Sequence, residues 1–162
     1  MLLQGSCHCG AVRFTVESQH PYPFNLCYCS ICRKTAGAGG YAINISAQNE
    51  TLKVDGAGNI RSYRAKLTGE DGGSALESPA ERKFCGHCGS ALWLWDPRWP
   101  ELLHPHASAI DTALPRPPER THMMLASKPA WVNACVEEGD RTCDEYPEES
   151  IATWHERHGL AG

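Results

Sequence analysis

Cysteine placement constrains this chain more than any other feature of its sequence. Seven of the nine cysteines fall into three short clusters with CxC, CxCxxC and CxxC spacing: Cys7 and Cys9, then Cys27, Cys29 and Cys32, then Cys85 and Cys88. An odd number of cysteines cannot pair completely in disulfides, and such spacings let a tight turn direct several sulfurs at one ion. The clusters therefore predict a fold organised around bound metal.

The first and third clusters together offer a closed site of four thiolates. Structural zinc takes four tetrahedral Cys or His ligands, and the glycines that flank both clusters permit turns whose amides can donate to sulfur. We expect one structural zinc ion to be held by Cys7, Cys9, Cys85 and Cys88. Its binding would contribute folding free energy to a small domain.

The middle cluster stands apart with three cysteines. Three protein ligands and one open position is the pattern of catalytic zinc, because water or substrate takes the fourth place. Cys27, Cys29 and Cys32 are therefore expected to hold a second, catalytic zinc ion, which makes two Zn²⁺ per chain. One alternative is an inert site closed by His8 or His87. Another is an iron–sulfur cluster, although the spacing matches neither common ferredoxin pattern.

Hydrophobic alternation predicts a mainly β fold. Val12, Phe14 and Val16 alternate with polar residues, as in a half-buried strand. The other strand-like runs are short and are separated by Gly, Pro, Asn or Asp; they cover residues 41–45, 51–54, 60–64, 91–95 and 122–125. This pattern favours antiparallel sheets over alternating βαβ units.

One short helix is expected near the C-terminus. Pro147 suits its first turn, and Gly159 stands where a C-terminal cap belongs. Ile151, Trp154 and His155 share one face at helical spacing with His158, and this face is expected to dock against a sheet.

Length and charge narrow the classes of function. A chain of 162 residues is long enough for one domain, which we expect to span residues 1–162, with a tail and helix over 137–162. The net charge of −4 gives no basic surface for nucleic acid. The first residues lack the apolar run of a signal peptide, and no apolar stretch approaches a membrane span of about 18 residues. These features predict a cytoplasmic protein without nucleic-acid or membrane partners.

Three longer motifs carry a family resemblance. The segments GSCHCGAVRF, CYCSICRKTAGA and FCGHCGSALW are similar to those of the glutathione-dependent formaldehyde-activating (Gfa) family, which includes centromere protein V type domains. The resemblance extends from about Gly5 to Trp131. It implies the Mss-four-like zinc β-tent, a fold of antiparallel sheets with few helices. It also assigns the cysteines as above, four to a structural zinc and three to a catalytic zinc.

The activity implied by the resemblance is that of a carbon–sulfur lyase. The reaction joins formaldehyde to glutathione to give S-hydroxymethylglutathione, so the expected partners are a small thiol and an aldehyde. A thiol needs to lose its proton before it attacks a carbonyl, and zinc with an open position can lower the pKa of that thiol. Two other functions remain open: a lyase for a different thiol adduct of a larger metabolite, and a non-catalytic zinc-bearing interaction module.

Several other residues are candidates for supporting roles. Arg33 and Lys34 follow the middle cluster and could meet a substrate carboxylate, although solvated basic residues explain them as well. Tyr28 and Ser30 lie between ligands and could hydrogen-bond sulfur or substrate. Asp111 and His122 fit the family pattern, and Cys135 and Cys143 are expected to be inert thiols outside the clusters. The tail over 137–162 is expected to border the substrate opening.

Overall fold

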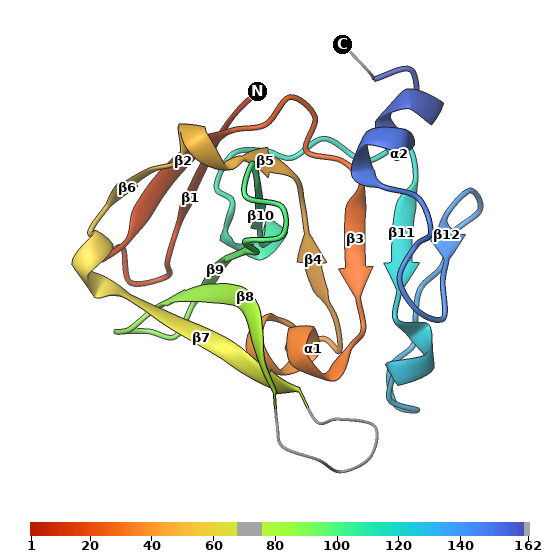
Figure 1. Ribbon diagram of the computed structural model, residues 1–162, viewed down its shortest axis with the longest axis horizontal. Helices are drawn as coiled ribbons and strands as arrows, with labels where there is room; N and C mark the ends of the chain where they lie inside the picture. The colour runs from red at the N-terminus through yellow and green to blue at the C-terminus, as the bar shows by residue number, and fades with distance from the viewer. Residues whose placement is uncertain (68–75, 161–162) are drawn as a thin grey trace.

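Short strands form three sheets in the computed structural model, which describes residues 1–67 and 76–160 (Figure 1). In the N-terminal sheet, β2 (Arg13–Glu17) lies between β1 (Leu2–Ser6) and β6 (Lys53–Asp55), and both pairings are antiparallel. The alternation predicted around β2 places Phe14 in the core, where its ring meets Trp93 edge-on at a centroid distance of 5.0 Å.

The second sheet contains five antiparallel strands in the order β5-β10-β9-β8-β7. Its strands are β5 (Ala47–Gln48), β10 (Leu102–Pro105), β9 (Ala91–Trp95), β8 (Leu76–Cys85) and β7 (Ile60–Leu67). β9 matches the predicted run 91–95, and β7 contains the predicted run 60–64. The long strand β8 ends at the first cysteine of the third cluster, so this sheet positions that cluster.

The third sheet has the order β12-β11-β3-β4 and carries the middle cysteine cluster at the end of β3. Its strands are β12 (Arg141–Thr142), β11 (Arg120–Met123), β3 (Phe24–Cys27) and β4 (Ala42–Asn44). β3, which was not among the predicted runs, is antiparallel to β4, as expected of an antiparallel architecture, whereas β11 runs parallel to both of its neighbours. The long connection between β3 and β11 permits this parallel pairing, which a local sequence pattern does not reveal.

Two α-helices flank the third sheet (Figure 1). α1 (Ser30–Ala36) follows β3 directly and was not predicted. α2 (Ile151–Arg157) begins later than Pro147, because the hydroxyl oxygen of Ser150 accepts a 3.1 Å hydrogen bond from the N–H of Thr153 and caps the helix there. Trp154 on its predicted inner face is 1% exposed, which confirms that this face is docked.

Four short 3-10 helices complete the described elements: η1 (Asn49–Thr51), η2 (Ala57–Asn59), η3 (Ala107–Ala109) and η4 (Leu125–Ser127). η1 includes the first residue of the predicted run 51–54, and η4 includes the last residue of the run 122–125. β6 therefore begins later than the sequence pattern indicated, and β11 ends earlier. The mainly β class and the short C-terminal helix are confirmed.

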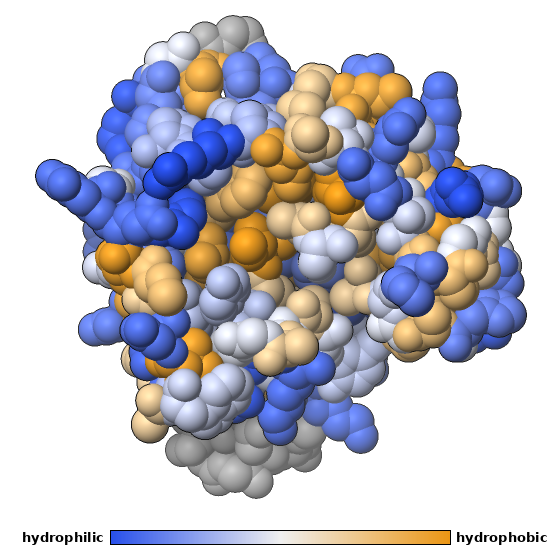
Figure 2. Space-filling model, turned by 180° about the vertical axis from the view of Figure 1, so that it is seen from behind, coloured by the Kyte–Doolittle hydropathy of each residue, from blue (hydrophilic) through white to orange (hydrophobic). Residues whose placement is uncertain are grey.

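Apolar side chains gather in three clusters rather than in one. The largest fills the space between the first and second sheets, a second surrounds the middle cysteines, and a third lies on the opposite face of β3. Seen from behind, apolar side chains also collect in a central hollow ringed by charged ones (Figure 2). Among the described residues, no helix has the length and apolar character needed to cross a bilayer.

Candidate metal centres

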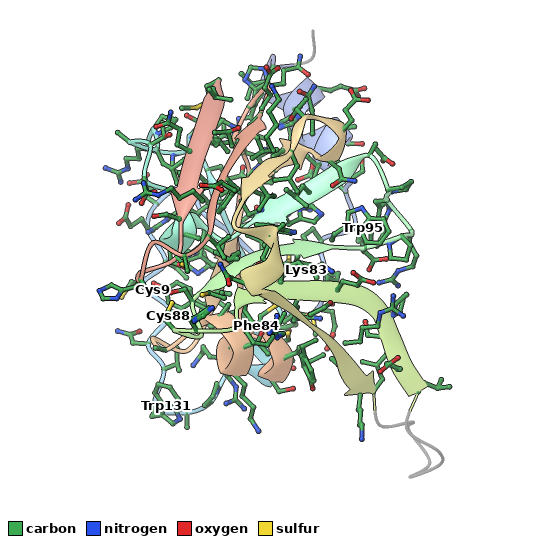
Figure 3. All side chains as sticks on the ribbon, turned by 90° about the vertical axis from the view of Figure 1, so that its left-hand side faces the viewer. Cys9, Lys83, Phe84, Cys88, Trp95 and Trp131 are labelled. Atoms are coloured by element: carbon green, nitrogen blue, oxygen red, sulfur yellow. The ribbon has the colours of Figure 1, made fainter. Side chains whose placement is uncertain are left out.

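The first and third cysteine clusters meet in space. The four sulfurs of Cys7, Cys9, Cys85 and Cys88 all lie within 4.8 Å of one another. Cys9 Sγ lies 3.5 Å from Cys7 Sγ and 3.8 Å from Cys85 Sγ. A tetrahedral zinc ion with Zn–S bonds of about 2.3 Å separates its sulfurs by about 3.8 Å, so this group could hold a metal ion. Figure 3 shows Cys9 and Cys88 together at one edge of the molecule.

Hydrogen-bond donors lie next to three of these sulfurs. The N–H of Val12 donates to Cys7 Sγ at 3.2 Å, and the N–H of His87 donates to Cys85 Sγ at 3.4 Å. Cys88 Sγ lies 3.2 Å from the hydroxyl oxygen of Ser90, and this contact lowers the pKa of Cys88 to about 5. Gly89 follows with φ +75°, a backbone conformation that favours glycine.

The middle cluster is assembled by the junction of β3 and α1. Cys27 ends β3, Cys29 is the N-cap of α1 and Cys32 lies in its first turn. Their sulfurs lie within 4.8 Å of one another, and the side chains are 2%, 9% and 6% exposed. The N–H of Cys32 donates to Cys29 Sγ at 3.3 Å. A helix that starts inside a CxCxxC motif thus brings all three sulfurs to one point.

The three sulfurs of the middle cluster share their hydrogen-bonding protons. Contacts with Cys27 and Cys32 lower the pKa of Cys29, and contacts with Cys29 and Cys32 raise the pKa of Cys27. Thiols that lie so close together cannot all ionise unless a cation balances their charge.

The three middle cysteines form an incomplete ligand set. Within the described ranges, no Cys, His, Asp or Glu ligand atom joins the three sulfurs as a fourth member of their group. His87, one of the residues considered for closing the site, instead pairs with Asn59, with its Nε2 2.9 Å from Asn59 Oδ1. His8 is exposed beside the first cluster, where its N–H donates to Ser90 Oγ. The geometry therefore gives no support to a site closed by either histidine.

The C-terminal segment borders the middle cluster. Cys143 packs with Ile31, Ala36 and Met124 against the three sulfurs, whereas Cys135 is exposed and belongs to neither group. The phenol of Tyr146 is within electrostatic reach of the three cysteines, while the residue as a whole is 68% exposed. No local sequence pattern indicated Tyr146, because only the fold brings it near the cluster.

Tyr28 and His122 belong to a chain of hydrogen bonds next to the middle cluster. Tyr28 is fully buried, and its hydroxyl lies 2.9 Å from His122 Nδ1. His122 Nε2 lies 3.2 Å from Asp140 Oδ2, and the guanidinium Nε of Arg120 donates to the same carboxyl at 3.0 Å. An ionised carboxylate only accepts, so Nε2 carries the imidazole proton and Nδ1 accepts from Tyr28. These residues support the cluster rather than reach its sulfurs, while Ser30 is exposed.

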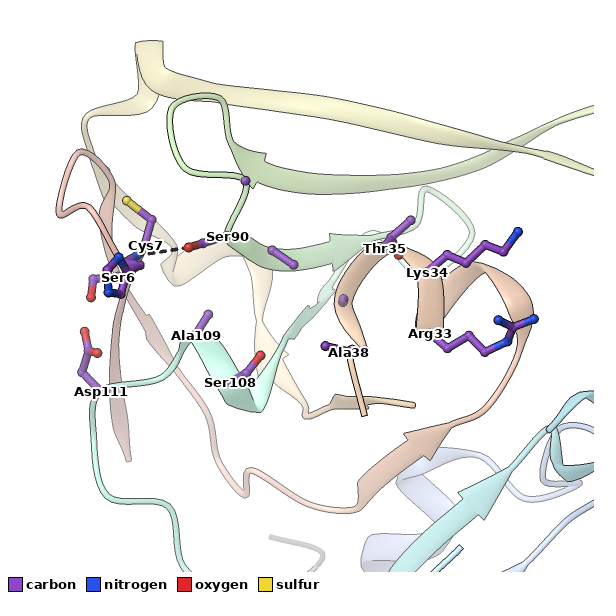
Figure 4. Close-up of a pocket in the computed structure, with 15 residues that line it drawn as sticks. Ser6, Cys7, Arg33, Lys34, Thr35, Ala38, Ser90, Ser108, Ala109 and Asp111 are labelled. Carbon is purple, nitrogen blue, oxygen red and sulfur yellow. Dashed lines mark hydrogen bonds between the residues drawn. The ribbon is translucent and has the colours of Figure 1, made fainter. Parts of the chain in front are cut away.

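A cavity of about 700 Å³ lies beside the first cluster, not the middle one. Its lining includes Ser90, Asp111, Arg33 and Lys34. Figure 4 shows the charged ends of Arg33 and Lys34 directed away from Ser90 and Asp111 on the opposite wall. The two basic side chains therefore do not converge with these polar groups on a common point.

Comparison with known proteins shows the family of the chain. A family model described as "glutathione-dependent formaldehyde-activating enzyme" matches residues 2–126. A Halomonas elongata protein, provisionally named a glutathione-dependent formaldehyde-activating enzyme, is 63% identical over 160 residues, which cover 99% of this chain and 98% of the relative. A crystal structure of a Rhodobacter sphaeroides protein is 30% identical with a TM-score of 0.53, over 70% of this chain and 92% of that one. The chain therefore belongs to the glutathione-dependent formaldehyde-activating family.

Proposed function

We propose that the protein is a zinc-dependent carbon–sulfur lyase that forms or cleaves S-hydroxymethylglutathione from glutathione and formaldehyde. Family membership and the name of the Halomonas elongata relative support this activity. The observation that carries the proposal is the middle cluster, in which three buried sulfurs converge without a fourth side-chain ligand in the described part of the chain. That arrangement leaves one position for a substrate.

The donor set of both clusters fits zinc. Thiolates are soft ligands that select zinc over magnesium or calcium, and sulfur separations near 3.8 Å suit a tetrahedral ion. We assign the structural zinc to Cys7, Cys9, Cys85 and Cys88, and the catalytic zinc to Cys27, Cys29 and Cys32. The first site would join the β1–β2 turn to the end of β8 and so stabilise the scaffold of the second.

The reaction adds the S–H bond of a thiol across a carbonyl. A C–S bond forms, the C=O double bond becomes single, and the thiol proton ends on the oxygen. A free thiol has a pKa of about 8.5, so only a few per cent of it is ionised at neutral pH. Bound zinc supplies positive charge that lowers the pKa of a sulfur in the open position.

Residues of the chain hold the reacting groups. β3 and α1 fix the three sulfurs, and Ala42 and Met123 pack against them. The phenol of Tyr146 is protonated at neutral pH, since the ordinary pKa of tyrosine is about 10. Tyr146 is within electrostatic reach of the cluster, so its phenol can donate a hydrogen bond to a substrate oxygen at the rim.

Removal of one middle cysteine tests the proposal. Zinc per chain is measured by atomic emission, and adduct formation is followed by NMR against the uncatalysed rate, for wild type, Cys32→Ala and the exposed control Cys135→Ser. We expect two zinc ions and catalysis in wild type and Cys135→Ser, and one zinc ion and no catalysis in Cys32→Ala. The proposal is wrong if Cys32→Ala retains both zinc ions and full turnover. Two zinc ions without any catalysis in wild type would favour a non-catalytic module.

A further inference from the structure

One face of the third sheet carries a polar row beside the middle cysteines. Strand register places Met123, Cys27 and Ala42 side by side. Two residues along each strand, and thus on the same face, lie Thr121 and Asn44. Two residues of a strand span about 6.6 Å. Thr121 and Asn44 therefore lie about 6.6 Å along their strands from the residues that meet the cluster, a distance that a small substrate can span.

The second sheet contributes a positive charge to the same region. Arg82 on β8 is in register with Leu94 on β9, which pairs with His104 on β10. His106 follows two residues after His104 and forms a β-bridge with Asn44 of the third sheet. The guanidinium of Arg82 is within electrostatic reach of Cys32 and Tyr146 on one side and of His106 on the other.

Four side chains in this region present buried polar atoms without hydrogen-bond partners, and we call them the polar quartet: Asn44 Oδ1, Arg82 Nη1, His106 Nδ1 and Thr121 Oγ1. Asn44, His106 and Thr121 are 5%, 4% and 2% exposed. Most buried polar groups in folded proteins are hydrogen-bonded, so four unpartnered atoms on the facing strands of two sheets indicate a site for a polar group.

Arg82 also carries no carboxylate partner among the described residues. Its neighbour Glu81 binds Lys83 at 2.6 Å and also Arg64, on the other face of β8. Apart from the nearby sulfur of Cys32, no described acidic group balances the charge of this guanidinium. A partly buried charge without a carboxylate partner is unfavourable, so an anion is the expected occupant.

The chemistry of the quartet matches a carboxylate. Burial, with a contribution from the charge of Arg82, lowers the pKa of His106 to about 4, so its imidazole is neutral and Arg82 supplies the one positive charge. A planar guanidinium forms paired hydrogen bonds with a planar carboxylate, and a hydroxyl and an imidazole can add further ones.

We propose that the polar quartet is a carboxylate-binding subsite that orients the substrate at the three-cysteine cluster, an inference that rests on the proposed function. The carboxylate can belong to the thiol, since glutathione has two, or to a carbonyl substrate that is itself an acid.

The test measures dissociation constants by titration calorimetry with glutathione, glyoxylate and the uncharged thiol 2-mercaptoethanol. Zinc-loaded wild type is compared with Arg82→Gln, with the isosteric variant Thr121→Val, and with Arg64→Gln as the control on the other face of the sheet. Arg82→Gln is expected to raise the dissociation constant of at least one carboxylate-bearing probe by about tenfold or more. The zinc content and the binding of 2-mercaptoethanol should not change. Thr121→Val is expected to act in the same direction, and Arg64→Gln to have no effect.

Modified probes identify the source of the carboxylate. The glycyl ethyl ester of glutathione lacks one carboxylate, and cysteinylglycine lacks the other. The probe whose affinity no longer responds to Arg82→Gln has lost the carboxylate that the quartet binds. If Arg82→Gln weakens the binding of glyoxylate alone, the subsite binds the carboxylate of the carbonyl substrate.

Two results would overturn the proposed subsite. If Arg82→Gln weakens the binding of every probe equally, including 2-mercaptoethanol, Arg82 has a structural role. If neither Arg82→Gln nor Thr121→Val changes the dissociation constant of any probe, the quartet binds only water. The failure of the proposed function looks different, because wild type would then hold one zinc ion and bind no thiol. Glyoxylate binding would still test the quartet in that case.

Discussion

Asp140 links the C-terminal segment to the strand pair that carries the middle cluster, and its replacement by Asn should destabilise the protein strongly. The carboxyl is 7% exposed and accepts hydrogen bonds from Arg120 Nε at 3.0 Å, from the N–H of Glu137 at 2.9 Å and from His122. Asp140→Asn preserves the shape of the side chain. It removes the charge opposite Arg120 and places an NH₂ donor among donors.

The expected loss in free energy of unfolding follows from the burial of the Asp140 and Arg120 side chains. Loss of one partner from a fully buried ion pair costs about 3–5 kcal/mol. The Arg120 side chain is 25% exposed, so water can partly solvate it when its partner is lost. We therefore expect Asp140→Asn to lower the free energy of unfolding by about 2–3 kcal/mol at pH 7.

The carboxyl of Asp140 should also make the free energy of unfolding depend on pH in the acidic range. Hydrogen bonds from Arg120 and from the backbone outweigh desolvation and hold the pKa of Asp140 below its usual range. Because the folded pKa is depressed, the stabilisation is fully present above the unfolded pKa of about 3.9. It is lost as the pH falls toward the folded pKa. Asp140→Asn should therefore lose less stability than wild type between neutral pH and pH 3.

Urea unfolding, followed by tryptophan fluorescence from pH 7 to pH 3, measures both effects. Asp144→Asn is the matched control, because Asp144 is exposed on the same segment and only its backbone carbonyl accepts a recorded hydrogen bond, from Ala126. We expect this control to change the free energy of unfolding by less than about 0.5 kcal/mol. Equal, small effects of the two variants would refute the role assigned to Asp140.

Three further substitutions test smaller parts of the structure by the same unfolding assay. Tyr28→Phe should cost about 1 kcal/mol, because it leaves His122 Nδ1 without its buried donor; a variant as stable as wild type would contradict this hydrogen bond. Gly56→Ala should cost more than about 2 kcal/mol, since φ is +75° and the added Cβ would lie 2.0 Å from the carbonyl oxygen of Ala11. Gly89→Ala has the same φ but open space around it, so only the backbone strain of about 1 kcal/mol is expected, and the reverse order of the two variants would refute the comparison.

The two groups of cysteines that could hold metal ions could be predicted from the sequence because cysteine spacing is a local signal. CxC and CxxC motifs direct sulfurs through tight turns, and the seven clustered cysteines leave few ways to combine. The run 91–95 was likewise predicted because aromatic and aliphatic residues lie there between Ser90 and Asp96. The family resemblance rested on the same local motifs and is confirmed.

Features that depend on distant contacts were not predicted. α1 spans seven residues, is capped by a cysteine and lacks an apolar stripe, so its stability comes from its place between β3 and β4 rather than from its pattern. The parallel pairing of β11 joins residues about a hundred positions apart. Arg82 was not predicted as a site residue, because it lies between Glu81 and Lys83 and three successive charged residues resemble a solvated strand; only the fold shows that its Nη1 atom is buried without a partner.

Cadmium-113 NMR of the cadmium-substituted protein would show whether the three middle cysteines hold a metal ion with an open position, since each substituted site gives its own signal. We expect two signals in wild type, of which one is absent in Cys32→Ala. Addition of glutathione should move only that signal toward the position of the four-sulfur site, because a fourth sulfur joins the three cysteines. A single cadmium signal in wild type, or two signals that both ignore glutathione, would contradict an open three-cysteine site.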